Sequence, residues 1–190
     1  MTNATNVTNE TISKDARLTQ AERTEISDQR MFDTAVSLIN ERGPAATRLS
    51  DVGVLAGYSR GLASHRFGSK DSLFNFVVLR VGDIWLEQLK HATRNQSGFA
   101  AIEKAVDQHY QFCLDAPAHL RAFYTLWFES VNAESELSNT IQKIHQRRFQ
   151  DVVNWVLADD ETGGAEKTRC RYYCCAIWRV NNWHRLFLVG

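Results

Sequence analysis

The stretch TRLSDVGVLAGYSRGLASHRFGSKD, residues 47–71, decides how the rest of this 190-residue chain is interpreted. Its pattern predicts two short helices joined by a tight turn. Thr47 is a candidate N-cap, because its hydroxyl can accept a hydrogen bond from the first turn of a helix. Apolar residues then recur at helical spacing from Leu49 to Ala56. Gly57 is expected to end this helix, since glycine suits the left-handed conformation that often follows one.

The second short helix is predicted to begin after Ser59. Ala63 and Phe67, four residues apart, are expected to face the interior. Arg60, Ser64 and His65 are expected to face outward. A third helix is expected from Lys70 onward.

Two helices joined by a three- to four-residue turn that contains glycine form the helix-turn-helix pattern. In that motif the second helix lies in the major groove and presents its N-terminal residues to base edges. The local charge agrees, because residues 47–70 hold four basic residues and one acid while the formal net charge of the chain is zero. On spacing and charge alone, an ordinary helical hairpin stays open as the alternative.

The segments AGYSRGL (residues 56–62) and FGSKDSL (residues 67–73) resemble the TetR family of transcriptional regulators. The similarity covers about residues 29–73, including Gly43. It implies an all-α fold in which an N-terminal three-helix DNA-binding head is joined by a long helix to a helical ligand-binding and dimerisation body. The chain departs from the family pattern at Ser64, where many relatives carry tyrosine. It also has Gly53 where alanine is usual, which should loosen the first motif helix slightly.

The resemblance also implies which residues meet double-stranded DNA. Arg60 is the candidate for base recognition, and Gly61 would let the backbone approach closely. Thr47, Arg48 and Lys70 are expected to hold phosphates, using helix N-termini as well as charge. The full expected set is Thr47, Arg48, Arg60, Gly61, Leu62, Ser64, His65 and Lys70. A two-fold dimer would read half-sites about one helical turn apart on a near-palindromic operator.

The domain organisation follows from composition and periodicity. Residues 1–25 are polar and weakly patterned, so we expect a disordered arm. Residues 26–72 are assigned to the DNA-binding domain, with the motif at about 48–67 and a first helix that starts at Ser27 or Asp28. Residues 73–190 are assigned to the ligand-binding and dimerisation domain.

The body is predicted to be helical throughout. A long helix is expected from about Lys70 to about Arg94, where apolar residues form a wide face. Further helices are expected at about 99–115, from Pro117, at about 135–158 and at about 165–188. No segment rich in β-branched residues alternates with period two, so no strand is predicted.

Several function classes have no support in the sequence. No run of 18 or more apolar residues is present, and the first residues lack an apolar signal-peptide core, so we expect a cytoplasmic protein with no membrane partner. Cys170, Cys174 and Cys175 are interpreted as free thiols, with redox sensing or metal binding as alternatives. No catalytic arrangement, metal site or cofactor is predicted, and the protein is not expected to be an enzyme.

Aromatic residues are concentrated in the body, and they form either a core of large side chains or a pocket for a small apolar ligand. The resembling family holds an inducer pocket in this region, which favours the pocket. The candidate lining residues are His109, Cys113, Phe123 and Trp127, and the small-molecule inducer is unknown.

A homodimer is expected through the last helix, because related proteins pair their terminal helices into a four-helix bundle. The candidate interface residues are Tyr173, Ile177, Val180, Trp183 and Phe187. This chain has one predicted helix after Gly164, and that helix is rich in basic residues. We therefore expect a weaker dimer than is usual in the family, strengthened by added salt.

These features together predict a sequence-specific, ligand-responsive transcriptional regulator, with repression as the favoured mode. The alternative is a helical small-molecule-binding or interaction protein without DNA readout. Steep weakening of DNA binding with rising salt would distinguish the two. The operator, the ligand and the regulated genes are not specified by the sequence.

Overall fold

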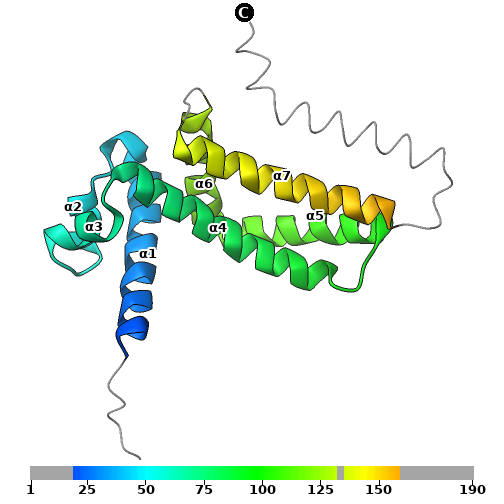
Figure 1. The fold of residues 1–190 in the computed structure, drawn as a ribbon, viewed down its shortest axis with the longest axis horizontal. Helices are drawn as coiled ribbons and strands as arrows, with labels where there is room; N and C mark the ends of the chain where they lie inside the picture. Colours follow the sequence, from blue (N-terminus) through cyan, green and yellow to red (C-terminus); the bar gives the residue numbers. More distant parts are fainter. Residues whose placement is uncertain (1–18, 132–134, 159–190) are drawn as a thin grey trace, which may run out of the picture.

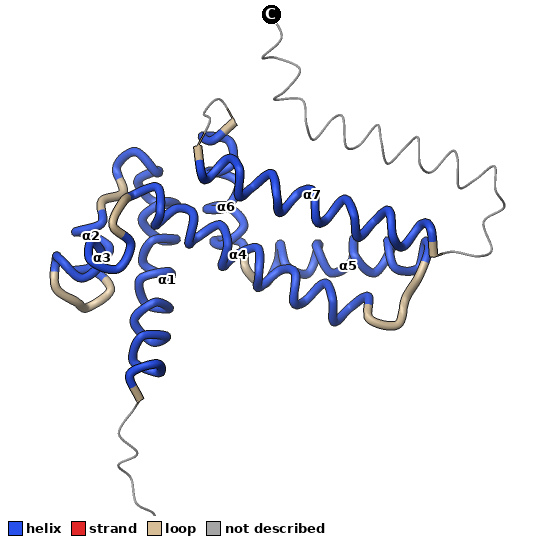
Figure 2. Tube along the Cα trace, in the orientation of Figure 1, coloured by secondary structure: helices blue, strands red, loops and turns tan. Residues whose placement is uncertain are grey.

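The computed structural model describes residues 19–131 and 135–158, and every regular element in these ranges is an α-helix (Figures 1 and 2). The all-α expectation is therefore confirmed for this part of the chain. In Figure 1, α1 to α3 form one end, and α4 leads away from them to lie beside α5 and α7. The helices are α1 Gln20–Ala46, α2 Leu49–Leu55, α3 Arg60–Phe67, α4 Lys70–Thr93, α5 Gly98–Asp115, α6 Pro117–Ser130 and α7 Glu136–Leu157.

The first helix begins earlier than the sequence suggested. Thr19 is its N-cap, and the Thr19 hydroxyl accepts a hydrogen bond from the Glu22 backbone N–H at 3.2 Å. The Glu22 carboxylate in turn accepts from the Thr19 backbone N–H at 2.7 Å, which completes a capping box. These hydrogen bonds from Thr19 lower the pKa of Glu22. The predicted helix start at Ser27 or Asp28 was wrong, because the capping box at Thr19 begins the helix earlier and makes residues 20–25 helical. The rest of the predicted arm lies outside the described residues.

The end of α1 is set by Gly43, whose φ of 76° and ψ of 164° break the regular helix before Pro44. One further turn leads to Thr47, which is 1% exposed and donates its hydroxyl hydrogen to the Gly43 carbonyl oxygen at 2.9 Å. The N-cap of α2 is therefore Arg48, not Thr47 as predicted. The hydroxyl of Thr47 closes the preceding turn instead of opening the next helix.

The turn between α2 and α3 depends on two glycines. Gly57 adopts a φ of 86°, as the sequence predicted for a residue that follows a helix. Gly53 lies inside α2 at the point where the start of α3 crosses it, and a Cβ on Gly53 would lie 2.7 Å from the Ser59 carbonyl oxygen. The missing side chain at Gly53 is therefore what allows α3 to pack so closely, which is a more specific role than the slight loosening we expected.

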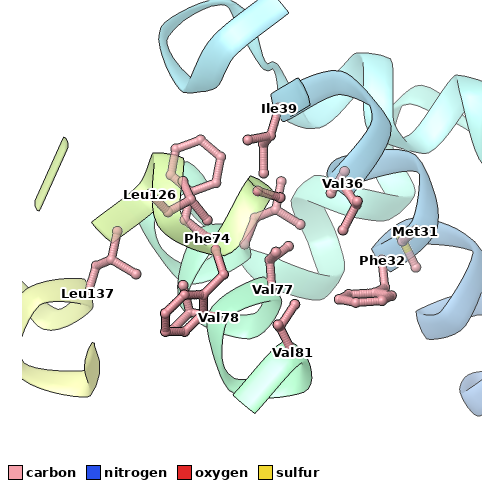
Figure 3. Packing of buried hydrophobic residues seen from close by; sticks show 14 of the residues in the cluster. Met31, Phe32, Val36, Ile39, Phe74, Val77, Val78, Val81, Leu126 and Leu137 are labelled. Atoms are coloured by element: carbon pink, nitrogen blue, oxygen red, sulfur yellow. The ribbon is translucent and has the colours of Figure 1, made fainter. Parts of the chain in front are cut away.

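The core is continuous from the head into the body. Figure 3 shows Phe32 and Val36 of α1 directed toward Val77 and Val81 of α4. The same buried cluster continues along α4 to α6 and α7, where Leu126 is 1% exposed. The three head helices do not enclose a core of their own, and α4 supplies the apolar face that completes it.

In the body, α4, α5 and α7 pack against one another, and α6 packs against α1 of the head as well as α4. Pro117 occupies the first turn of α6, where a missing N–H costs nothing. Ser135 caps α7 by accepting a hydrogen bond from the Ser138 N–H at 3.1 Å. The predicted bounds of α4, α5 and α7 agree with the observed ones to within one residue at each end.

The predicted last helix lies outside the described residues, and with it Cys170, Cys174, Cys175 and the five candidate interface residues. Among the helices that are described, none combines the length and the apolar character needed to cross a membrane.

We predict that Gly53→Ala destabilises the protein. The added methyl group must push α3 away from α2, and overpacking of this kind costs about 1–3 kcal/mol. That cost outweighs the gain of about 0.5–1 kcal/mol that alanine brings to a helix interior. Chemical denaturation followed by circular dichroism measures the difference.

Gly61→Ala is the matched control, because a Cβ on Gly61 would have nothing within 4 Å. This variant should be as stable as the unmodified protein or more so. If both variants gain stability, the close approach at Gly53 does not constrain the turn.

Candidate DNA-binding surface and body cavity

The helix α3 is held against the head by one face only. On this face, Ala63 is fully buried, and Leu62 and Phe67 are half-buried against the core cluster. The inward positions of Ala63 and Phe67 confirm the helical spacing in the sequence. Leu62, expected at the DNA, instead directs much of its side chain to the core, so its contribution to a DNA surface is reduced.

The opposite face of α3 is open. Arg60 and Gly61 in its first turn are exposed, as are Ser64 and His65. Arg48, at the start of α2, is also exposed. Within the described part of the chain, neither Arg48 nor Arg60 forms an ion pair, so both guanidinium groups are available to an external anion.

A bidentate ion pair fixes the orientation of α3. Arg66 donates from Nε to Asp28 Oδ1 at 2.9 Å and from a terminal nitrogen to Asp28 Oδ2 at 2.6 Å. Asp28 is 6% exposed, and its hydrogen bonds raise the pKa of the Arg66 guanidinium. Arg66 is one of the four basic residues of 47–70, and its guanidinium holds the head together through Asp28. The available signal was an acid, Asp28, three residues before Met31 on the buried side of α1.

The two remaining phosphate candidates differ in accessibility. Lys70 lies in the first turn of α4, where its ammonium group donates to the Ala45 carbonyl oxygen at 2.8 Å and lies 5.5 Å from the centre of the Phe74 ring. Two of its three hydrogens are left for an anion. Thr47 is buried and its hydroxyl is occupied, so we remove it from the set of DNA-contacting side chains.

A cavity lies in the body, where α4 to α7 meet. Its free interior volume is about 20 Å³, and the space between its lining side chains is about 310 Å³ when the open solvent at its mouth is counted. His109 and Phe123, two of the predicted lining residues, line it, whereas Cys113 and Trp127 do not. Trp127 instead stacks between Tyr124 and Phe128 and lies 4.2 Å from the His145 ring centre. The complete lining is Val81, Gly82, Trp85, His109, Phe112, Leu120, Phe123, Tyr124, Ile144 and Arg148.

The polar groups of the cavity gather around Trp85. The Arg148 guanidinium carbon lies 3.9 Å from the centre of the Trp85 ring, and the His109 ring meets the same indole edge-on at 6.1 Å. Burial lowers the pKa of Arg148, and the nearby Tyr124 opposes this effect. Burial, together with the charge of Arg148, also lowers the pKa of His109, which favours the neutral imidazole.

The cavity is connected to the head through α6. Leu120, Phe123 and Tyr124 line the cavity from this helix. At the start of α6, the side-chain amide of Asn40 donates to the Ala118 carbonyl oxygen at 2.9 Å, and the His119 ring lies 5.2 Å from that of Phe32. The helix α6 therefore contacts both the cavity and α1 of the head.

The N-terminal region matches a known family. Residues 32–77 fit the model of the family described as bacterial regulatory proteins, tetR family. This N-terminal region is therefore similar to that of the TetR family. The match includes the end of α1, the whole helix-turn-helix unit and the first part of α4, which is the region where the sequence resemblance was found.

Curated proteins that this chain resembles are named as transcriptional regulators. A helix-turn-helix transcriptional repressor of Mycobacterium tuberculosis is 32% identical over 79 residues, which is 42% of this chain and 40% of that protein. The regulator BetI of Burkholderia thailandensis is 25% identical over 127 residues, 66% of this chain and 64% of that protein. The chain thus spans less than two thirds of the length of either relative. Their names agree with the expectation of a regulator and not an enzyme.

Solved structures support the fold over most of the chain. A TetR-like transcriptional regulator from Rhodococcus sp. RHA1 superimposes with a TM-score of 0.63 at 18% identity, covering 92% of this chain and 90% of that one. NalD of Pseudomonas aeruginosa, a secondary repressor of a multidrug efflux pump, gives a TM-score of 0.51 at 19% identity, with 89% of both chains covered. At these identities the similarity establishes the fold alone.

We predict that Asp28→Asn destabilises the head by about 1–3 kcal/mol, the usual range for a hydrogen bond to a charged group. The substitution preserves size but removes the negative charge and one of the two acceptors for Arg66. Chemical denaturation of both proteins gives the difference in the free energy of unfolding.

Asp33→Asn is the control, because Asp33 lies on the same helix and is exposed. The loss caused by Asp28→Asn should also shrink when Arg66 has already been replaced by methionine, since the pair is then absent. An undiminished loss would assign the effect to Asp28 alone.

Proposed function

We propose that the protein is a sequence-specific DNA-binding transcriptional regulator that responds to a small molecule. The observation that carries this proposal is the arrangement of α3, whose inner face is fixed by the core and by Arg66 while its first turn presents exposed polar and basic groups. A recognition helix needs both properties, because base contacts require a rigid frame and an accessible outer face.

Charge and geometry assign roles on this surface. Arg60 is exposed in the first turn of α3, the part of a recognition helix that meets base edges. Arg48 and Lys70 each lie at the start of a helix, where cationic groups and backbone N–H groups favour phosphate. Ser64 and His65 extend the exposed face of α3 toward its C-terminal end.

Ligand response follows from the cavity and its connection to the head. A ligand that fits better when α6 is displaced would favour a conformation in which α1, and with it α3, is reoriented relative to DNA. The hydrogen bond from Asn40 to Ala118 and the contact between Phe32 and His119 are the links through which this change would reach the head. Repression relieved by ligand is the favoured mode.

Dimerisation is the second part of the proposal. Two heads related by a two-fold axis would read the two halves of a near-palindromic operator. The residues we expect at the interface are outside the described ranges, so the test is the oligomeric state in solution. Sedimentation at low and high salt should show a dimer that salt strengthens and that Trp183→Glu weakens. A monomer at every salt concentration would exclude the two-half-site arrangement.

We predict that Arg60→Ala reduces sequence discrimination while leaving the fold intact. A good bidentate base contact is worth about 1–3 kcal/mol, so affinity for the selected operator should fall by that amount and affinity for random duplex should change little. Operators are first selected from random duplex DNA, and both affinities are then measured at one salt concentration. Arg94→Ala, an exposed arginine at the far end of α4, serves as the control.

Equal losses on operator and random duplex would give Arg60 a phosphate role. Affinity for either duplex that does not weaken as salt rises would instead support the alternative of a helical binding protein without DNA readout.

We also predict that Gly61→Ala weakens operator binding although it leaves folding intact or improves it. The position is exposed and open, so the methyl group meets nothing within the protein. It would, however, stand between α3 and DNA where the backbone approaches. Operator affinity and thermal stability are measured on the same preparation, and unchanged operator affinity would show that Gly61 does not face DNA closely.

A further inference from the structure

The body cavity contains a positive charge that no carboxylate in the described part of the chain neutralises. Arg148 forms no ion pair with an acidic residue in the ranges 19–131 and 135–158. Its guanidinium lies over the Trp85 ring at 3.9 Å, a cation–π contact that compensates only part of the cost of removing a charge from water. The guanidinium retains its five N–H donors for a planar acceptor.

Two further groups in the same cavity have unused hydrogen-bonding capacity. Trp85 is 7% exposed, and its indole N–H has no acceptor among the described residues. His109 Nδ1 is buried and likewise has no partner among them. Buried polar groups in native proteins are almost always paired with protein, water or ligand, so these two groups beside an arginine without an ion pair have hydrogen-bonding capacity that a ligand can meet. Arg148, Trp85 and His109 all line the cavity, which makes one ligand the simplest partner for all three.

The rest of the lining sets the character of that ligand. Val81, Phe112, Leu120, Phe123 and Ile144 surround the polar cluster with apolar surface. The free volume inside the cavity is about 20 Å³, which is room for about one water molecule, so a ligand of this kind must displace lining side chains as it enters. Arg148 is the one cationic side chain in the lining, and the lowered pKa of His109 works against a second positive charge. A ligand with one negative charge and an apolar body matches this set, whereas a dianion would leave one charge unpaired.

We propose that the cavity binds a small apolar monocarboxylate, whose carboxylate pairs with Arg148 and whose hydrocarbon or aromatic body packs against the apolar lining. The planar carboxylate matches the fork of the guanidinium, and its second oxygen can accept the Trp85 N–H. This inference identifies the chemical class of the ligand, and its regulatory meaning rests on the proposed function. The binding itself does not depend on that function.

The test is calorimetric titration of the full chain with benzoate, phenylacetate, hexanoate and octanoate, each compared with its neutral amide. At least one carboxylate should bind about tenfold or more tightly than its amide, because a charge-assisted, bidentate contact is lost in the amide. If no carboxylate binds, or if every carboxylate binds no better than its amide, the proposal is overturned.

Variants at two neighbouring arginines locate the effect. Arg148→Met keeps an unbranched apolar stem and should reduce the preference for carboxylate over amide to about twofold or less, whereas Arg148→Lys should retain part of it. Arg147→Met, at the adjacent exposed position, should leave the preference unchanged. A preference that survives Arg148→Met would place the carboxylate elsewhere and overturn the assignment.

The melting temperature without ligand separates ligand binding from a structural role. If Arg148 pairs with an acid of the chain outside the described residues, Arg148→Met leaves that acid unpaired and should lower the melting temperature by about 10 °C. A fall of that size would overturn the proposal. Little change, or a rise, is expected if the charge is uncompensated until a ligand arrives.

A final comparison distinguishes this inference from the proposed function. The tightest carboxylate is added to the complex of protein and selected operator. Binding of the carboxylate without release of the operator would confirm the ligand class and contradict ligand-controlled regulation. If the protein binds the operator but none of the carboxylates, DNA binding is confirmed and the proposed ligand class is wrong.

Discussion

The apolar face of α4 is the constraint on which the rest of the structure depends. Its first half, from Leu73 to Val78, closes the core of the three head helices. Its second half supplies Val81, Gly82 and Trp85 to the body cavity. Since one rigid helix is part of both cores, the head cannot change orientation without disturbing the wall of the cavity. This shared packing is the route by which the proposed ligand response would reach the head.

Polar contacts hold α3 and α4 in place against α1. The pair between Arg66 and Asp28 fixes α3 against α1, and the hydrogen bond between Arg80 and Glu25 adds a link from α4 to the same helix. The first of these includes a nearly buried carboxylate, so its loss is costly, whereas the second is largely exposed and contributes little. The orientation of the recognition helix therefore depends more on one buried acid than on the total charge of the surface.

The cavity presents the opposite case, in which a charge lacks a partner. A charge that is withdrawn from water without an ionic partner destabilises the fold, and Arg148 is half-buried with no such partner among the described residues. Arg148 lies over an indole ring with acceptor-seeking groups beside it, which is the arrangement of a binding site prepared for an anion. A protein that binds an acidic ligand here would gain stability on binding, and this gain is available to bias one arrangement of the helices over another.

The sequence by itself determined the helical class, most helix ends and the helix-turn-helix unit, because periodicity, caps and glycines such as Gly57 act locally along the chain. The sequence also contains the capping box at Thr19, which marks the start of α1. It places Arg148 four residues after Ile144, on the apolar face of a helix, which marks a charge directed toward the interior. Tertiary structure alone decided that Thr47 is buried and that Asp28 pairs with Arg66, 38 residues away in the sequence. It also decided that Trp127 does not line the cavity. Those outcomes depend on how helices distant in sequence pack together, which no local pattern of residues specifies.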